Sequence, residues 1–182
     1  MAQSGRSSGC RLGGPEVIVS EELRGLIDFA RIGGWHWREP YNAVFGFMTG
    51  DPDEICTIED GAYVIRKHER GMVSKPEIRS VRLEDIDKYL SFRFGNTVRR
   101  ERGLSNIWLP VVPPAEVGEE RDGYSFSGSL AEMIVSWTDS DVRREVVLGS
   151  RSAAKWVQYS RFSAADIRQS YLNPDGSPLF SS

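Results

Sequence analysis

The sequence contains few of the residues from which metal sites, disulfides and membrane spans are built. Its 182 residues include two cysteines and two histidines. Cys10 and Cys56 have no CxxC or Cys/His spacing, which argues against a disulfide framework and a structural zinc site. No stretch approaches the roughly 18 consecutive apolar residues of a membrane span, and residues 1–15 lack the apolar core of a secretory signal. We therefore expect a cytoplasmic protein without a metal or other cofactor.

An excess of positive charge is also missing. Lys and Arg number 23 against 26 Asp and Glu, which gives a net charge of -3. This balance removes the global electrostatic argument for a partner made of nucleic acid or anionic lipid. Hydrophobic residues make up 40% of the chain, which is enough for a buried core, and the length fits one ordinary domain. We expect a flexible tail over residues 1–15 and a single domain over residues 16–182.

Three segments have the periodicity of amphipathic helices. The first runs from the N-cap Ser20 to a pair of glycines. The third begins at Ser163, where Asp166 completes a capping box, and an Asn-Pro pair ends it. The second is expected to stop at Gly95 and to bury an apolar stripe against a sheet. That stripe consists of Leu83, Ile86, Leu90 and Phe94.

Short β-prone runs surround these helices. Gly61 can adopt the positive φ of a tight turn, so we expect a hairpin between residues 55–58 and 62–66. The polar residues 67–79 are expected to form a loop, and the proline-punctuated residues 107–114 to cross an edge or a surface. Further strands are expected over residues 41–47, 124–127, 133–137, 142–148 and 156–162. The predicted fold class is therefore α+β, with a mostly antiparallel β-sheet and about three helices packed on it.

No motif for catalysis or nucleotide binding stands out. The sequence has neither GxGxxG after a strand nor GxxxxGK[ST], and the segment around Ser125 lacks the second glycine of a nucleophile elbow. His36 lies between two tryptophans of an extended segment and His68 follows a basic pair, so both are expected on the surface. We therefore predict no catalytic residue and a protein that is not an enzyme.

Acidic residues gather in several predicted loops. Such charges usually belong to solvated loops, and the functional alternative is an acidic face that docks into a cationic cleft of a partner. The arginines of residues 93–102 follow the second helix, where cations complement the helix dipole. Among the tryptophans, Trp108 beside the proline-rich segment is the best candidate for exposure.

Four segments carry a resemblance to a known family. They are Ile86-Asp-Lys-Tyr89-Leu90 with Phe94-Gly95, Arg99-Arg-Glu-Arg-Gly103-Leu104, Val146-Val-Leu-Gly149-Ser150 and Tyr171-Leu-Asn-Pro-Asp-Gly176-Ser-Pro-Leu-Phe180. Over roughly residues 20–180 the sequence resembles the TNT antitoxin family, which are immunity proteins of actinobacterial polymorphic toxins. The C-terminal ending is the most specific piece. There Pro174 terminates the helix, and Leu179 and Phe180 give the chain end two apolar anchors.

The resemblance implies a non-enzymatic antitoxin that binds a cognate NAD-hydrolysing toxin in the cytoplasm of the producing cell and occludes its active site. We expect a monomer or a 1:1 complex with the toxin. A site that accepts the phosphates of NAD is expected to be cationic, so the inhibitor should present carboxylates to it. The predicted toxin contacts are five acids around one hairpin, which we call the acidic group: Asp51, Asp53, Glu54, Glu59 and Asp60.

Two alternatives belong to other functional classes. A small cytoplasmic ligand-binding or enzyme domain would need polar side chains that converge in a pocket. A nucleic-acid-binding protein would need the arginines of residues 99–102 to merge with other basic residues into one stripe.

Overall fold

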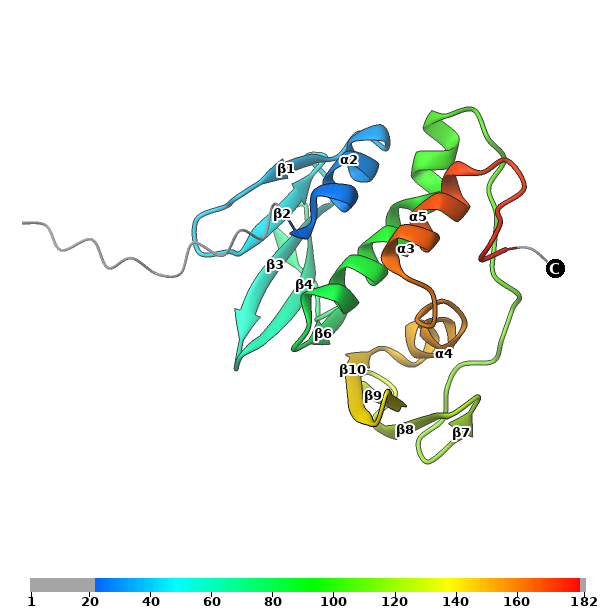
Figure 1. The fold of residues 1–182 in the computed structure, drawn as a ribbon. Coiled ribbons are helices and arrows are strands. Elements are labelled where there is room, and N and C mark those ends of the chain that lie inside the picture. Colours follow the sequence, from blue (N-terminus) through cyan, green and yellow to red (C-terminus); the bar gives the residue numbers. More distant parts are fainter. Residues whose placement is uncertain (1–21, 181–182) are drawn as a thin grey trace, which may run out of the picture.

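The structure of the protein is a computed structural model that describes residues 22–180. Ten strands form one sheet in which every pairing is antiparallel, and four helices lie within the described residues, so the predicted α+β class is confirmed (Figure 1). The strand order is β1-β2-β3-β4-β6-β10-β9-β8-β7, and β5 pairs with β4.

The elements follow one another along the chain in two β-then-helix sets. The first set is α2 (Arg24–Ile32), β1 (His36–Arg38), β2 (Phe45–Met48), β3 (Asp53–Glu59), β4 (Ala62–Glu69), β5 (Met72–Val73), β6 (Ile78–Ser80) and α3 (Leu83–Glu101). The second set is β7 (Glu120–Arg121), β8 (Tyr124–Gly128), β9 (Met133–Asp139), β10 (Val142–Leu148), α4 (Ser150–Tyr159) and α5 (Ala164–Leu172). The predicted tail and the predicted N-cap Ser20 lie outside the described residues.

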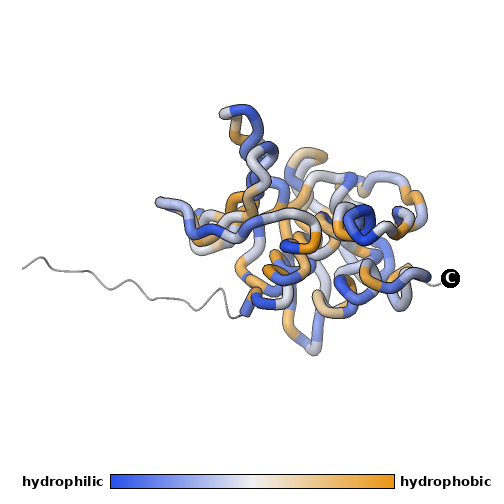
Figure 2. The backbone as a smooth tube through the Cα atoms, turned by 90° about the horizontal axis from the view of Figure 1, so that it is seen from above, coloured by the Kyte–Doolittle hydropathy of each residue, from blue (hydrophilic) through white to orange (hydrophobic). Residues whose placement is uncertain are grey.

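The helices cover one face of the sheet. In Figure 1, α2, α3 and α5 lie beside the first strands, and α4 lies beside β8 to β10. Because side chains alternate along a strand, Cys56 and Ile65 point into the core under the helices, whereas Thr57 and Val64 belong to the opposite face. Figure 2 shows hydrophobic stretches gathered inside the molecule and hydrophilic turns projecting from it. None of the described helices is long and apolar enough to span a membrane.

The hairpin of β3 and β4 turns where the sequence predicted it. Asp60 and Gly61 have φ angles of 50° and 76°, and Glu59 pairs with Ala62 across the turn. Positive φ at two successive residues is typical of the tight turns that match the twist of a hairpin. The hairpin is longer than expected, because the predicted loop over residues 67–79 is wrong: it contains the end of β4, all of β5 and the start of β6. The polar composition of residues 67–79 gave no strand signal, although β4 and β6 lie in the middle of the sheet and β5 pairs with β4.

Helix α3 buries the predicted stripe but continues past its predicted end. Leu83, Ile86, Leu90 and Phe94 are all buried. The predicted stop at Gly95 is wrong, because the helix runs on to Glu101. A Cβ at this glycine would lie 2.3 Å from ring atoms of Tyr171 in α5. The glycine therefore serves close packing of two helices and not termination.

The C-terminal helices show one confirmed boundary and one error. The hydroxyl of Ser163 accepts a hydrogen bond from the Asp166 amide at 3.0 Å, and the predicted capping box is present. The strand predicted over residues 156–162 is wrong, because most of it belongs to α4. Ala153, Trp156 and Val157 share the buried face of that helix, and a short aromatic-rich run does not separate the two structures by periodicity.

Candidate functional site

The acidic group is spread along the whole length of β3. Asp53 and Glu59 are the first and last residues of this strand, so their backbones lie about 20 Å apart. Asp51 precedes the strand and Asp60 follows it in the turn. Glu54 points to the helix-covered face and is 3% exposed. The structure therefore places four of the five predicted contacts in two accessible pairs at opposite ends of the strand, and buries the fifth.

At the first end, the carboxylates hold a loop in place. Asp53 Oδ1 accepts hydrogen bonds from the backbone amides of Thr49 and Gly50, both at 2.9 Å. Asp51 Oδ2 lies 3.6 Å from Arg70 Nε, in an exposed ion pair. These contacts fix the turn that leads from β2 into β3 while leaving the Asp51 side chain accessible.

At the turn end, both carboxylates have arginine partners. Arg66 donates to Glu59 from Nε at 3.2 Å and from Nη2 at 2.8 Å. This fork of hydrogen bonds holds the pKa of Glu59 below its ordinary value. Arg79 donates from Nη2 to Asp60 at 3.2 Å, although the Asp60 side chain is 89% exposed.

Glu54 belongs to a buried network between the sheet and α3. Its Oε1 accepts from Arg93 Nε at 3.2 Å, and its buried Oε2 has no hydrogen-bond partner among residues 22–180. Burial raises the pKa of Glu54, and the Arg93 charge opposes that shift. A second ion pair lies beside it, with Lys67 Nζ 3.3 Å from Glu77 Oε1. The hydroxyl of Tyr89 donates weakly to Glu77 at 3.4 Å.

The two histidines do not form a site together. Both are exposed, as predicted. His36 lies in β1 and His68 in β4, three strand spacings apart in the sheet, which corresponds to about 14 Å. No group of three His, Cys, Asp or Glu side chains in the described part of the chain is arranged to hold a metal ion. The thiol of Cys56 is buried, which raises its pKa to about 12 and keeps it protonated.

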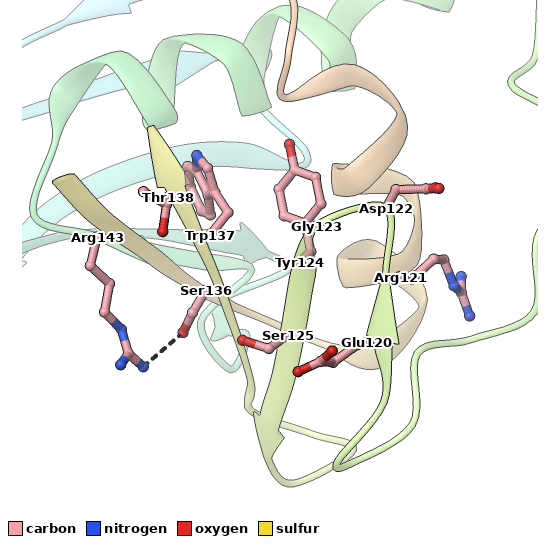
Figure 3. A pocket seen from close by; sticks show the side chains of 10 residues that line it. All are labelled: Glu120, Arg121, Asp122, Gly123, Tyr124, Ser125, Ser136, Trp137, Thr138 and Arg143. Atoms are coloured by element: carbon pink, nitrogen blue, oxygen red, sulfur yellow. Dashed lines mark hydrogen bonds between the residues drawn. The ribbon is translucent and has the colours of Figure 1, made fainter. Parts of the chain in front are cut away.

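A polar hollow of about 500 Å³ lies over β8, β9 and β10 (Figure 3). Figure 3 shows Ser125 and Ser136 on the strands that form it, with the rings of Tyr124 and Trp137 turned to the other side. Arg143 Nη2 donates to the Ser136 hydroxyl at 3.3 Å. This contact leaves the hydroxyl beside a cation and not beside a base that could accept its proton. The contact at Ser136 is therefore not the nucleophile and base pair that the enzyme alternative would use there.

Residues 104–115, which we call the strap, connect α3 to the second set of strands and run along the outer side of the helices (Figure 1). The side chain of Asn96 holds it twice: Asn96 Nδ2 donates to the Ile107 carbonyl at 2.8 Å, and the Ile107 amide donates to Asn96 Oδ1 at 2.9 Å. The Ala115 amide donates to the Ser150 carbonyl at 3.2 Å. Between these anchors Trp108 is 73% exposed and Val111 is fully exposed. The predicted exposure of Trp108 is confirmed.

Beside Trp108 lies a hollow of about 430 Å³, which we call the aromatic hollow. Its walls include Phe92 of α3 and Tyr159 of α4, whose rings stack with centroids 4.2 Å apart and planes 4° apart. Arg100 and Lys155 also line it, and Arg93 and Glu77 form the wall that meets the hairpin network. Sequence reasoning missed this hollow because its walls come from segments more than 50 residues apart.

The arginines at the end of α3 do not form one exposed stripe. Arg99 is 1% exposed and donates to three backbone carbonyls of the C-terminal segment: Tyr171 at 3.3 Å, Asn173 at 2.6 Å and Pro174 at 2.9 Å. A further bond goes to the carbonyl of Ser105 at the start of the strap. Arg99 therefore joins the helix, the strap and the chain end, while its neighbour Arg100 remains 65% exposed.

The fold and these surfaces define an α+β protein with helices on one face of an antiparallel sheet and a rigidly anchored strap. The chain belongs to the Immunity protein 61 (Imm61) family, whose model matches residues 29–179. The predicted resemblance to immunity proteins is thereby confirmed, and with it an immunity, or antitoxin, role.

Individual relatives agree with this assignment. The chain is 29% identical over 121 residues to the "Immunity factor for TNT" of Mycobacterium tuberculosis, and equally to the "Immunity factor for TNT homolog" of Mycobacterium bovis BCG. The matched region covers 66% of this chain and 67% of each relative. The solved structure of Rv3902c from M. tuberculosis has the same fold, with a TM-score of 0.67 and 23% identity, over 86% of this chain and 92% of that one.

Proposed function

We propose that the protein is an antitoxin that binds a cognate NAD-hydrolysing toxin domain and occludes its active site. Membership of an immunity-protein family over residues 29–179 is the observation that carries this proposal. The names of the relatives, immunity factors for TNT, support a toxin as the protein partner. The complex is proposed to form in the cytoplasm of the producing cell, where an NAD-hydrolysing toxin would otherwise consume a shared metabolite.

The inhibition is proposed to be non-enzymatic and to need no cofactor. The histidines lie apart in the sheet, and the Ser136 hydroxyl of the polar hollow accepts a hydrogen bond from Arg143. Inhibition then rests on affinity alone. Because one free enzyme molecule turns over many NAD molecules, nearly every toxin copy must be held, which requires a Kd near or below about 1 nM.

The four accessible members of the acidic group, Asp51, Asp53, Glu59 and Asp60, are proposed to face the toxin, whereas the buried Glu54 is not. An interface of ordinary size buries about 800 Å² on each partner, a patch roughly 30 Å wide that can include both ends of β3. The pairs Asp51–Arg70 and Asp60–Arg79 are exposed, and such pairs stabilise a fold by only about 0–1 kcal/mol. A cationic toxin site can therefore replace the arginine partners at little cost.

The test is a titration of NAD consumption by the cognate toxin domain. Wild-type protein is expected to abolish the activity at a 1:1 ratio and to consume no NAD by itself. Toxin activity that persists under excess protein would contradict the proposed function.

A charge-neutralised pair tests the acidic group. Asp51→Asn with Asp60→Asn is expected to slow association about tenfold at low salt, with a smaller difference at high salt. The control, Asp122→Asn with Asp141→Asn, removes the same charge from other turns, and asparagine tolerates the positive φ of these residues. Equal association rates for the two double variants would place the docking surface elsewhere.

A further inference from the structure

We propose that Trp108 and the aromatic hollow anchor the toxin, and that they take an apolar side chain of the toxin flanked by a carboxylate. The inference rests on the proposed function and names the surface that supplies its affinity. The aromatic hollow differs from the acidic group in chemistry, because the acidic group offers negative charges and the hollow offers apolar walls with a cationic rim.

Trp108 has the properties of an interface anchor. A tryptophan that is 73% exposed leaves a large apolar surface in water, and covering it releases free energy in proportion to the area buried. Val111, three residues further along the strap, adds a second exposed apolar side chain. Tryptophan is enriched among the few residues that dominate the affinity of protein interfaces.

The strap holds this anchor in place before binding. Asn96 pairs with both backbone groups of Ile107, the residue before Trp108, and Gln158 donates to the Pro110 carbonyl at 3.4 Å. Three prolines between residues 110 and 114 restrict the backbone further. An element that is already ordered loses little conformational entropy when a partner covers it, so more of the contact energy appears as affinity.

The hollow beside the anchor has the size and lining of a binding pocket. Its volume of about 430 Å³ falls in the range of roughly 300–1,000 Å³ that is usual for such pockets. The stacked rings of Phe92 and Tyr159 give it rigid apolar walls. An apolar side chain of a partner can enter between these walls and Trp108.

The rim charges define what must flank that side chain. Arg93 is already paired with Glu54, and Glu77 with Lys67. Arg100 Nε lies 3.9 Å from a carboxylate oxygen of its neighbour Glu101. Within residues 22–180, no carboxylate pairs with Lys155, so the rim carries uncompensated positive charge that complements a carboxylate of the partner.

The position of the hollow favours the toxin as its occupant. The Glu54–Arg93 and Lys67–Glu77 ion pairs join its wall to β3 and β4, the hairpin that carries the acidic group. Glu54 follows Asp53 directly in the chain. A partner of ordinary interface size that is seated on the hollow can therefore also reach the Asp51 end of the hairpin.

Equilibrium binding of the cognate toxin domain to full-length variants tests the anchor. Trp108→Ala is expected to weaken binding at least about 30-fold with an unchanged melting temperature, since the side chain is exposed in the free protein. The control is Tyr41→Ala, which removes an aromatic side chain that is 94% exposed in another part of the surface and should change the affinity less than about threefold. Lys155→Glu is expected to weaken binding about tenfold, mainly at low salt.

The outcomes separate this inference from the proposed function. If the wild-type protein binds and inhibits the toxin while Trp108→Ala binds within about threefold of it, the anchor is wrong and the antitoxin function stands. If the wild-type protein does not bind the toxin, the proposed function fails and the anchor fails with it. If Tyr41→Ala weakens binding as much as Trp108→Ala, the affinity is spread over the surface and the anchor is again wrong.

Discussion

The hairpin of β3 and β4 and the strap both meet solvent, but they do so with opposite chemistry. Every carboxylate of the acidic group already has a partner in the chain, either an arginine or a pair of backbone amides. The exposed side chains of the strap, Trp108 and Val111, lie outside the core, and only the backbone around them is anchored.

This difference separates two contributions to binding. Charges at the hairpin attract a cationic partner over a distance, and their existing ion pairs reduce what each new contact adds. Apolar groups on a fixed backbone act only at contact, where they contribute most of the affinity. The hairpin is therefore expected to control the rate of association, and the strap to control the rate of dissociation.

Among the variants that test this difference, the largest loss of stability is expected at Arg99, which fixes the start of the strap. Arg99→Ala removes a buried guanidinium and leaves several backbone carbonyls of the C-terminal segment without donors. We expect the free energy of unfolding to fall by about 3 kcal/mol or more, measured by denaturant titration. Arg100→Ala, at the exposed neighbouring residue, should change it by less than about 0.5 kcal/mol. Similar unfolding midpoints for the two variants would show that Arg99 is not the clamp described above.

Asn96 offers a milder way to loosen the strap. Asn96→Ala removes both hydrogen bonds to Ile107 and should lower the free energy of unfolding by about 1–2 kcal/mol. Toxin dissociation should accelerate while association stays nearly constant, because the acidic group is untouched. Asn96→Asp keeps the acceptor for the Ile107 amide and loses the donor to its carbonyl, so it should fall between the wild type and the alanine variant. A changed association rate with an unchanged dissociation rate would contradict the proposal that the hairpin controls association and the strap controls dissociation.

Glu54 makes the stability of the fold depend on pH, and the direction of its pKa shift gives the sign of that dependence. Burial raises its pKa above the ordinary value of 4.5, so the folded protein holds this proton more tightly than the unfolded chain does. The contribution of Glu54 to stability therefore decreases as pH rises from the ordinary pKa through the raised one. Glu54→Gln should remove that decrease from a series of unfolding measurements between about pH 4 and pH 7. Glu132→Gln, an exposed control, should leave the pH profile as in the wild type.

The smallest effect is expected at Glu59. The hydrogen bonds from Arg66 lower its pKa, so this pair stabilises the fold above the ordinary pKa of 4.5 and loses that contribution as pH falls through the lowered value. Because the pair is partly exposed, Glu59→Gln should change the free energy of unfolding by less than about 1 kcal/mol at neutral pH. A larger loss, measured by thermal or denaturant unfolding, would mean that the turn depends on this pair more than its exposure suggests.

Local chemistry explains which parts of the fold were predictable. The capping box at Ser163 and the turn at Gly61 are determined by a few adjacent residues, and both appear where the sequence placed them. Gly95 was misinterpreted because the reason for the glycine is a ring of α5, which lies far away in the chain. The aromatic run at residues 156–162 likewise takes its helical form from packing in the core.

In the candidate site too, features set by neighbouring residues were predictable and features set by distant packing were not. Strand alternation was a usable signal for Glu54: it lies two residues from Cys56 and therefore shares the buried face of β3. The exposure of Trp108 was predictable from its proline-rich surroundings. The aromatic hollow was not, because α3, α4 and the strap form it together through contacts that no local pattern encodes.

Amide hydrogen exchange of the protein, alone and in complex with the cognate toxin domain, tests most directly whether the strap and the hairpin hold the toxin. Several amides of the strap form no backbone hydrogen bond within residues 22–180 and should exchange rapidly in the free protein. In the complex, we expect strong protection over residues 104–112 and weaker protection over residues 49–53, with no change in the β7–β8 turn. Protection confined to that turn or to the polar hollow over β8 to β10, with the strap unchanged, would contradict the claim that the strap and the hairpin hold the toxin.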